Sequence, residues 1–322
     1  MRLIKFLLPV TALVSVYSKT VAQDTTKTSD NDANLVNQLE TQEAKNETNY
    51  AAATFKYTHV IDGQSVENLP ARVLDVRILH RFGPLSSGLY NFFGLDYSPF
   101  NVKIGFEYGI TNNFMIGVAH SGYNKTYDAF FKLRLLQQST GVVKSPVTIS
   151  FVPTLSISTL KPSQIDPAVK PDPTTDIRRA SYVLQLLLAR KFSEGFALQL
   201  MPTFVHADNI SFFHNRHEIF AIGIAGTQKL SKRINFNAEY YYQLPDMKAP
   251  GAHNVLSFGI GIGTGGHVFE LLFSNSFGLT EKSFITETSG RWDNADALFG
   301  FNISRVFQLG KKNRQSKEWN KK

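Results

Sequence analysis

Three glycines in the C-terminal third of the sequence have a spacing that is associated with dinucleotide binding. Gly261, Gly263 and Gly266, within "NVLSFGIGIGTGGHVFELLF", spell G-x-G-x-x-G. This motif binds a pyrophosphate only where a strand precedes it and a helix follows, because the helix N-terminus supplies the N–H donors. Here Val268 and Glu270 continue a pattern of alternation that is typical of a second strand. The motif therefore indicates a tight Gly-Thr-Gly-Gly hairpin that needs positive φ, and we predict no cofactor.

Serine and histidine residues were tested as a nucleophile and its base. His253 and Ser257 share one face of a strand, but four residues of strand separate them by about 13 Å. Such a distance is too long for the hydrogen bond that activates a serine. His120 and Ser121 are adjacent, so their side chains point to opposite faces. A lipid-modifying enzyme is therefore the least favoured function, and we predict that the protein is not an enzyme and has no catalytic residues.

Histidines that could ligate a metal gather in one expected loop. The stretch "HNRH" contains His214 and His217, and His206 and Asp208 come shortly before it. No third ligand follows at a spacing that is typical of zinc sites. We expect these histidines to be solvated or packed on the neighbouring aromatic residues, and we predict no metal site.

The elements that carry these residues have a period of two. Residues 101–110 show the pattern best, with one face apolar and the other polar or small. About twelve segments share this alternation, and no stretch after residue 23 has convincing helical periodicity. The apolar face of residues 101–110 contains Val102, Ile104, Phe106, Tyr108 and Ile110, opposite Lys103, Gly105, Glu107 and Gly109.

The connections between these segments alternate between short and long. Tight turns at one end, long loops at the other and an even number of strands are typical of an outer-membrane β-barrel. Strands of about ten residues match a tilted crossing of the hydrocarbon layer. A soluble β-sandwich is the alternative, but its polar face would need many charges, whereas here that face is mainly Gly, Ala, Ser, Thr and Asn. The predicted fold class is all-β: a transmembrane antiparallel up-and-down β-barrel of about twelve strands, with an N-terminal signal peptide and a disordered leader.

The composition divides the chain into five regions. Residues 1–23 begin with the basic residues Arg2 and Lys5, followed by an apolar run and then small residues, as in a secretory signal peptide. Residues 24–53 form a disordered polar leader, and residues 54–70 are either a plug of the lumen or a periplasmic segment. Residues 71–310 form the barrel, and residues 311–322 form a basic periplasmic tail. We therefore predict export through the inner membrane and location in the cell outer membrane.

The positive charge lies at the ends of the chain. The formal charge is +8, but three basic residues belong to the signal peptide and six, with one glutamate, to the last twelve residues. The region between the signal and the tail is formally neutral, so we predict no nucleic-acid partner. The expected partners are outer-membrane lipid and the outer-membrane assembly machinery, with a solute or soluble partner unidentified.

Charged residues on the predicted inner face are the remaining candidates for function. They are either an ion-pair network that fills the lumen or the lining of a narrow selective pore. We accordingly predict a small-solute channel or ligand-binding barrel, with a structural barrel that anchors a periplasmic or surface partner as the alternative. The candidate residues are Asp75, Arg77, Lys103, Glu107, Asp128, Lys132, Arg134, Glu239 and Glu270.

The C-terminal part of the chain resembles a known family. The stretches "RHEIFAIGIAGTQKLSKRINFNAEYYYQLP" and "GGHVFELLFSNSFGLTEKSFITETSGRWDNADALFGFNISRVFQL" are similar to an uncharacterised group of outer-membrane β-barrels that is common in Bacteroidetes and known only as a domain of unknown function. The likeness covers roughly residues 54 to 310. It implies the fold and the location, and no catalytic residues come with it.

Overall fold

The computed structural model of the protein describes residue 34 and residues 48–96, 101–164, 179–207, 217–248 and 251–310. The chain divides into two compact units, Met1–Glu47 and Thr48–Lys322, and the second contains the barrel. The predictions for the signal peptide, for most of the leader and for the basic tail fall outside the described residues. Among the described residues, no helix has the length and hydropathy that are needed to cross a bilayer.

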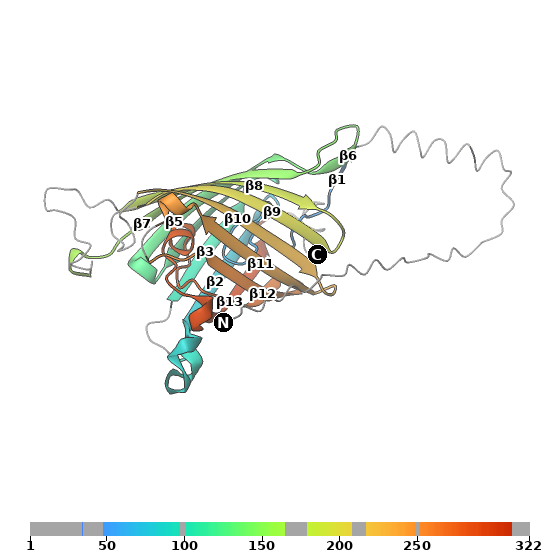
Figure 1. Ribbon diagram of the computed structural model, residues 1–322. Coiled ribbons are helices and arrows are strands. Elements are labelled where there is room, and N and C mark those ends of the chain that lie inside the picture. The colour runs from blue at the N-terminus through green and yellow to red at the C-terminus, as the bar shows by residue number, and fades with distance from the viewer. Residues whose placement is uncertain are drawn as a thin grey trace, which may run out of the picture. The chain divides into compact units, whose positions relative to one another are not determined.

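Twelve strands in the described part of the chain close an antiparallel barrel, as predicted (Figure 1). Each strand pairs with its neighbour in the chain, and the last strand pairs with the first to close the sheet. The strands are β2 (Val73–Pro84), β3 (Asn101–Gly109), β4 (Phe114–Ser121), β5 (Thr126–Leu136), β7 (Thr148–Ser158), β8 (Ala180–Lys191), β9 (Phe196–His206), β10 (Glu218–Lys229), β11 (Ile234–Gln243), β12 (Val255–Thr264), β13 (His267–Ser274) and β14 (Leu298–Gln308).

The alternation of side chains along the strands gives the barrel two different faces. On β3, Ile104 and Phe106 are 45% and 48% exposed on the outside, whereas Glu107 is 3% exposed and faces inward. β5 repeats the pattern, with Phe131 exposed and Lys132 buried. Because successive side chains of a strand point to opposite faces, the period of two in the sequence puts an apolar belt outside and most of the polar groups inside.

The ends of the barrel differ in the length of their connections. We call the end with residues 110–113, 192–195, 230–233 and the β12–β13 turn the tight-turn end, and the opposite end the long-loop end. In the β12–β13 turn, Gly265 and Gly266 have φ of +48° and +131°. These values confirm that the glycine motif is a hairpin, since the left-handed region favours glycine.

Two short strands lie outside the barrel and correct the sequence assignment. β1 (Thr48–Tyr50) pairs with β6 (Ser139–Gly141), which belongs to the connection between β5 and β7. The sequence assigns residues 48–50 to the disordered leader, because residues 24–50 are rich in acidic and polar side chains and have little to bury. A backbone partner that lies about ninety residues away in the chain supplies the strand pairing, so local composition could not reveal it.

The helical elements are short and lie in the connections. A six-residue α-helix in the loop between β13 and β14 was not predicted. Its N-cap, Thr280, accepts the N–H of Ser283 at 3.2 Å in a capping box, which explains how so short a helix forms in a chain without helical periodicity. The elements are α2 (Glu281–Thr286) and the 3₁₀ turns η1 (Leu85–Ser87), η2 (Leu89–Gly94), η3 (Tyr123–Lys125), η4 (Pro162–Gln164), η5 (Pro245–Met247) and η6 (Trp292–Asn294).

One sector of the inner wall is apolar and forms the hydrophobic core. Leu187 of β8, Met201 of β9 and Ile219 of β10 are fully buried on that side. They belong to one hydrophobic cluster with Ile61 and Phe284, neither of which belongs to a barrel strand. The interior is therefore packed with segments from outside the wall, and these segments define the candidate site.

Candidate functional site: the filled lumen

The lumen contains a segment of the chain that precedes the first barrel strand. Every residue from Val60 to Pro70 is buried. Residues 58–65 form a turn of antiparallel backbone that we call the lumen hairpin. In it, the N–H of Ser65 donates to the carbonyl of Thr58 and the N–H of Val60 donates to the carbonyl of Gly63, both at 2.9 Å.

Glu239 of β11 binds the tip of the lumen hairpin. Its carboxylate accepts the backbone N–H groups of Ile61 at 3.3 Å, Asp62 at 2.9 Å and Gly63 at 3.1 Å. Three consecutive N–H groups that converge on one anion form a backbone nest. A Cβ atom at position 63 would lie 3.2 Å from Glu239 Oε2 and would overlap the hydroxyl of Tyr241, so the tip requires glycine.

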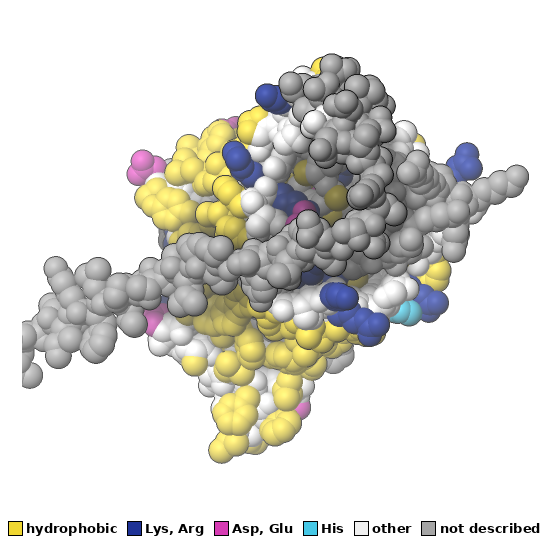
Figure 2. Space-filling view, turned by 90° about the vertical axis from the view of Figure 1, so that its right-hand side faces the viewer, with side chains coloured by type: hydrophobic (Ala, Val, Ile, Leu, Met, Phe, Trp, Pro, Cys, Tyr) yellow, Lys and Arg dark blue, Asp and Glu magenta, His cyan; other side chains and the backbone are white. Residues whose placement is uncertain are grey.

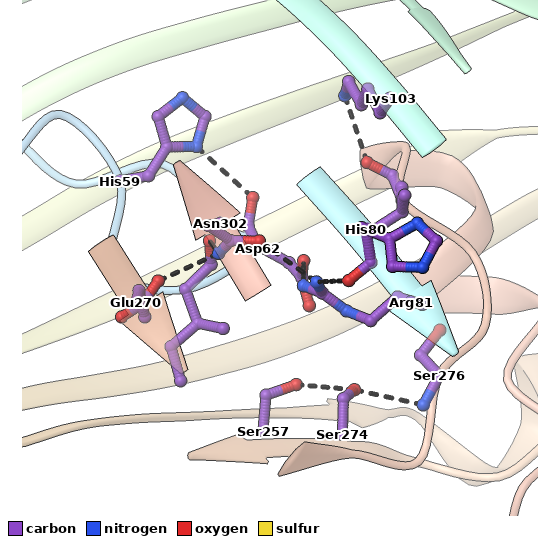
Figure 3. Close-up of polar contacts among 12 residues, drawn as sticks. His59, Asp62, His80, Arg81, Lys103, Ser257, Glu270, Ser274, Ser276 and Asn302 are labelled. Carbon is purple, nitrogen blue, oxygen red and sulfur yellow. Dashed lines mark hydrogen bonds and ion pairs between the residues drawn. The ribbon is translucent and has the colours of Figure 1, made fainter. Parts of the chain in front are cut away.

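Asp62 and Arg81 form an ion pair beside that tip. Both side chains are fully buried, and Arg81 Nη1 also donates to Asn302 Oδ1 at 3.0 Å (Figure 3). A buried ion pair is costly to break from one side, because the remaining charge is left without solvent. The pair therefore fixes the hairpin to β2 and β14.

Two asparagines hold carbonyl groups of the lumen hairpin. Asn237 Nδ2 donates to the Val60 carbonyl at 3.1 Å, and Asn302 Nδ2 donates to the Ile61 carbonyl at 3.0 Å. Each also donates to the carboxylate of Glu270, Asn237 at 2.7 Å and Asn302 at 2.9 Å. Figure 3 shows the contact of Asn302. Glu270 thus orients both amides that bind the hairpin.

The base of the lumen hairpin is held by cations of β5. Lys132 is fully buried, and its Nζ donates to the carbonyls of Thr58 and Glu67, both at 2.9 Å. Arg134 Nη2 lies 3.6 Å from Glu67 Oε2, and the other oxygen of that carboxylate accepts the N–H of Thr54 at 2.6 Å. These cations bind the strand that leads out of the hairpin as well as the one that enters it.

Glu107 of β3 binds the side of the hairpin. Its carboxylate contacts His59 Nε2 at 2.6 Å and accepts the hydroxyl of Thr58 at 3.1 Å. Arg77 Nε lies 3.9 Å from Glu107, and its Nη1 lies 3.6 Å from Asp75. Burial of the His59 imidazole, reinforced by the charge of Arg77, lowers the pKa of His59 to about 4, although Glu107 acts in the opposite direction. The imidazole is therefore neutral at pH 7.

The loop between β13 and β14 fills the lumen from the long-loop end. The ring of Phe284 in α2 packs at 5.4 Å from that of Tyr241, and both side chains are fully buried. Lys103 Nζ lies 2.8 Å from Asp128 and 3.7 Å from Glu281. Gln64 of the lumen hairpin donates to Glu281 at 3.4 Å, so the two insertions meet inside the barrel.

All the candidate charges from the sequence have buried or nearly buried side chains in the lumen, but they do not form one network. Lys103, which pairs with Asp128, contacts the loop between β13 and β14, which contains α2 and which we call the α2 loop. Asp75, Arg77 and Glu107 form a second group, Lys132 and Arg134 hold the hairpin base, and Glu239 and Glu270 hold its tip. The sequence analysis missed the hairpin partners Asp62 and Glu67. It also missed Arg81, Asn237 and Asn302. All three lie on the inward faces of their strands. The alternation predicts this for Asn237 and Asn302, but they are uncharged and the candidate set was limited to charged residues. The alternation assigned to residues 74–78 ends before Arg81.

The serines and histidines that were tested for catalysis have other contacts. Ser257 donates to Ser274 Oγ at 2.8 Å inside the barrel, and that oxygen accepts the N–H of Ser276 at 3.1 Å (Figure 3). The N–H of His253 donates to the Thr288 carbonyl at 2.6 Å. The imidazole of His120 packs against the ring of Tyr127, at 4.4 Å between centroids.

The loop histidines are only partly described. The rings of His206 and His217 lie 6.3 Å apart, and His206 stacks on Tyr182 at 4.7 Å. Asp208 and His214 lie outside the described residues. Within the described ranges, no three His, Asp or Glu side chains are grouped so as to hold a metal ion.

Solved structures with some similarity to the chain are outer-membrane proteins. The NanC porin is 9% identical, with a TM-score of 0.44, over 74% of this chain and 100% of its own. The KdgM porin is 8% identical, with a TM-score of 0.44, over 73% and 99% of the two chains. The outer membrane protein Omp33 of Acinetobacter baumannii is 10% identical, with a TM-score of 0.40, over 76% and 100%. The comparison with curated proteins found no match.

A family model gives the assignment. The model described as a membrane bound beta barrel domain (DUF5777) matches residues 55–307. This range begins in the segment that fills the lumen and ends in β14, so it contains the wall and both insertions. The match confirms the predicted resemblance to a family of barrels of unknown function. The chain therefore belongs to the DUF5777 family of membrane-bound β-barrel domains, and it is an outer-membrane β-barrel.

Proposed function

We propose that the protein is a channel for small polar solutes, closed in the described conformation by the lumen hairpin and the α2 loop. One observation carries the proposal. The polar side chains of the wall bind the backbone of a separate segment and not mainly one another, as Glu239, Lys132 and Asn302 show. Displacement of that segment would leave a passage lined by groups that bind water and polar solutes.

The position of the closing segment in the chain supports this proposal. The lumen hairpin precedes β2, and residues 66–72 are its covalent link to the first strand of the wall. It contributes no strand to the closed sheet, so its departure breaks no strand pairing of the wall. Eight-stranded barrels are filled by their own side chains and sixteen-stranded barrels conduct. A wall of twelve strands leaves room for an inserted segment.

A structural barrel that anchors a partner is the second candidate, and the packing of the lumen favours it. Ile61, Phe284 and Tyr241 are fully buried in one cluster, as in the core of a soluble domain. A barrel that is filled permanently in this way would hold its shape and present its ends to a partner without conducting.

Conductance of the refolded protein in planar lipid bilayers distinguishes the two functions. The full chain is compared with a chain that lacks residues 24–69 and with the Glu239→Gln variant, which keeps every residue of the hairpin. For the channel, we expect steady ion-selective steps in the deleted chain and more frequent openings in the variant. Heat-modifiable migration on gels checks that each barrel is folded. If none of the three folded proteins conducts, the result contradicts the proposed channel and supports the anchoring barrel.

A further inference from the structure

A second feature of the molecule is a cavity at the tight-turn end of the barrel. It has a volume of about 370 Å³ and lies between residues 52–56 on one side and the β8–β9 and β10–β11 turns on the other. Figure 2 shows this end as a hollow surface with Lys and Arg side chains around it. The volume is in the range of pockets that bind small molecules.

The charge of this cavity is positive. Lys56, Lys191, Lys229 and Lys232 line it, against the single acidic residue Glu194. Lys191 Nζ is engaged by Glu194 at 2.9 Å and by the carbonyl of Ala52 at 2.9 Å. Within the described ranges, neither Lys229 nor Lys232 has an ion-pair partner. Among the described residues, two ammonium groups of the cavity are therefore available to a ligand.

Lys56 shows the effect of this uncompensated charge. Its Nζ donates to the carbonyl of Arg233 at 3.1 Å, which holds the ammonium at the edge of the cavity. Partial burial, together with the positive charge of Lys229, lowers the pKa of Lys56. A bound anion would relieve the repulsion between these two ammonium groups.

Two hydroxyl groups of the turns add neutral donors. Ser193 Oγ accepts the N–H of Gly195 at 3.2 Å, and Ser231 Oγ accepts the N–H of Arg233 at 3.3 Å. Each oxygen is thus used as an acceptor inside its own turn, and both serines line the cavity. Among the described residues neither O–H group has an acceptor, so both can donate to an acceptor in the cavity.

From this arrangement we propose that the cavity is a binding site for a small anion that carries carboxylate or phosphate groups. Lys229 and Lys232 supply the main charge, Lys56 adds a third cation from the N-terminal segment, and the two serine hydroxyls complete the donor set. Charge-assisted hydrogen bonds of this kind are stronger than neutral ones. The proposal does not depend on conduction, because the ligand binds at the mouth and not within the filled lumen.

The location of the site couples the ligand to the N-terminal segment. Residues 52–56 form one wall of the cavity and lead directly into the segment that fills the lumen. An anion that touches Lys56 and Lys229 together bridges that segment to the barrel wall. Such a ligand binds more tightly when residues 52–56 lie against the barrel wall and the lumen hairpin is in the lumen, which we call the seated state. By linkage, the ligand therefore stabilises the seated state.

Isothermal titration of the full chain in a neutral detergent, with inorganic phosphate and with citrate as probes, tests the site. We expect both anions to bind at one site and to compete, with affinity falling as the salt concentration rises. The double variant Lys229→Gln/Lys232→Gln should bind at least about tenfold more weakly, because two charged donors are lost. The control is Lys161→Gln/Lys248→Gln, which removes the same charge from the long-loop end and should bind like the parent.

Two results overturn the proposal. One is equal loss of affinity in both double variants, which would show that net charge and not the cavity attracts the anion. The other is that the protein in detergent binds neither phosphate nor citrate, but binds phosphatidylglycerol when it is placed in nanodiscs that contain this lipid. That result would identify the lysines as contacts for lipid headgroups. Neither result bears on the bilayer conductance of the barrel, so failure of the anion site and failure of the channel are distinguishable.

Discussion

The carboxylate of Glu239 accepts the backbone N–H of Gly63 at 3.1 Å, although 176 residues separate the two in the sequence. The same carboxylate also accepts the N–H groups of Ile61 and Asp62. A single wall side chain thus satisfies the whole tip of the lumen hairpin, whose N–H groups have no water to bind in the packed interior. Removal of the carboxylate should therefore destabilise the hairpin tip more than it destabilises the strands of the barrel.

The first prediction concerns the Glu239→Gln variant. The glutamine keeps the shape of the side chain but replaces one acceptor oxygen by a donor, which faces the N–H groups of the tip. An unsatisfied buried donor costs about 1–3 kcal/mol, so protection of the amides of residues 61–63 from hydrogen exchange should fall about tenfold or more. Exchange measured by mass spectrometry on the refolded barrel checks this. Glu194→Gln, in an exposed turn at the tight-turn end, is the control, and unchanged protection in Glu239→Gln would refute the role of the carboxylate.

The second prediction concerns the fit of Gly63. The Gly63→Val variant places a branched side chain where a single Cβ would already meet Glu239 and Tyr241. The hairpin tip should be displaced, and the barrel should conduct more often in planar bilayers while still migrating as a folded barrel on gels. Gly195→Ala is the control, because a Cβ atom at position 195 would lie at an ordinary contact distance of 3.5 Å from its nearest neighbour, Gln228 Nε2. Identical current records for the two variants would show that the tip does not limit conduction.

Alternation along the strands was sufficient to predict the wall of the barrel. It gave little information on the lumen hairpin and the α2 loop, which fill the lumen. The strand count, the outward belt and the inward direction of Lys132 and Glu239 follow from a period of two, which each strand displays locally. The lumen hairpin has no such signal, because its partners are distant in the chain. Asn302 binds the Ile61 carbonyl across 241 residues.

Two further sequence signals, a turn motif and a capping box, are too short to predict where their segments lie relative to the barrel. The Asp62-Gly63 pair is typical of a tight turn, but a turn motif does not say whether the hairpin lies inside a barrel or beneath it. Likewise, Thr280 and Ser283 form a capping box over only one turn of helix. Its burial depends on the contact between Phe284 and Tyr241, which only the closed barrel creates.

The third prediction concerns pH and His59. The pKa of His59 is lowered to about 4 in the seated hairpin, whereas a solvated histidine titrates near about 6.5. The released state therefore binds more protons between these two values. The contribution of His59 to the free energy that holds the hairpin in the lumen is complete above about pH 6.5. This contribution is lost as the pH falls toward about 4.

Hydrogen exchange of residues 58–65 between pH 7 and pH 5, corrected for the intrinsic pH dependence of exchange, measures this effect. Protection should fall with pH in the parent, and it should fall less steeply in His59→Gln, which retains a polar side chain but does not titrate. Carboxylates of the lumen titrate in both proteins, so the difference between the two slopes reports on His59. Equal slopes would show that His59 does not couple seating to pH.

The last prediction concerns the Asp62–Arg81 ion pair, which lies without solvent between the hairpin and the wall. Asp62→Asn leaves the guanidinium buried and unpaired, and Arg81→Met leaves the carboxylate in the same state. Each single change should cost about 3–5 kcal/mol of stability, because an isolated buried charge is not compensated by water. The double variant Asp62→Asn/Arg81→Met removes both charges and should be less destabilised than the sum of the single changes.

Unfolding by guanidinium in detergent, followed by tryptophan fluorescence, gives the four free energies of this cycle. A coupling of several kcal/mol would show that the pair acts as a unit in seating the hairpin. The wall also contributes to these values, since Arg81 donates to Asn302 at 3.0 Å. An Asn302→Ala background separates the two effects: coupling between Asp62 and Arg81 that persists in it belongs to the ion pair itself. Additive changes in that background would assign the stabilisation to the asparagine and not to the charges.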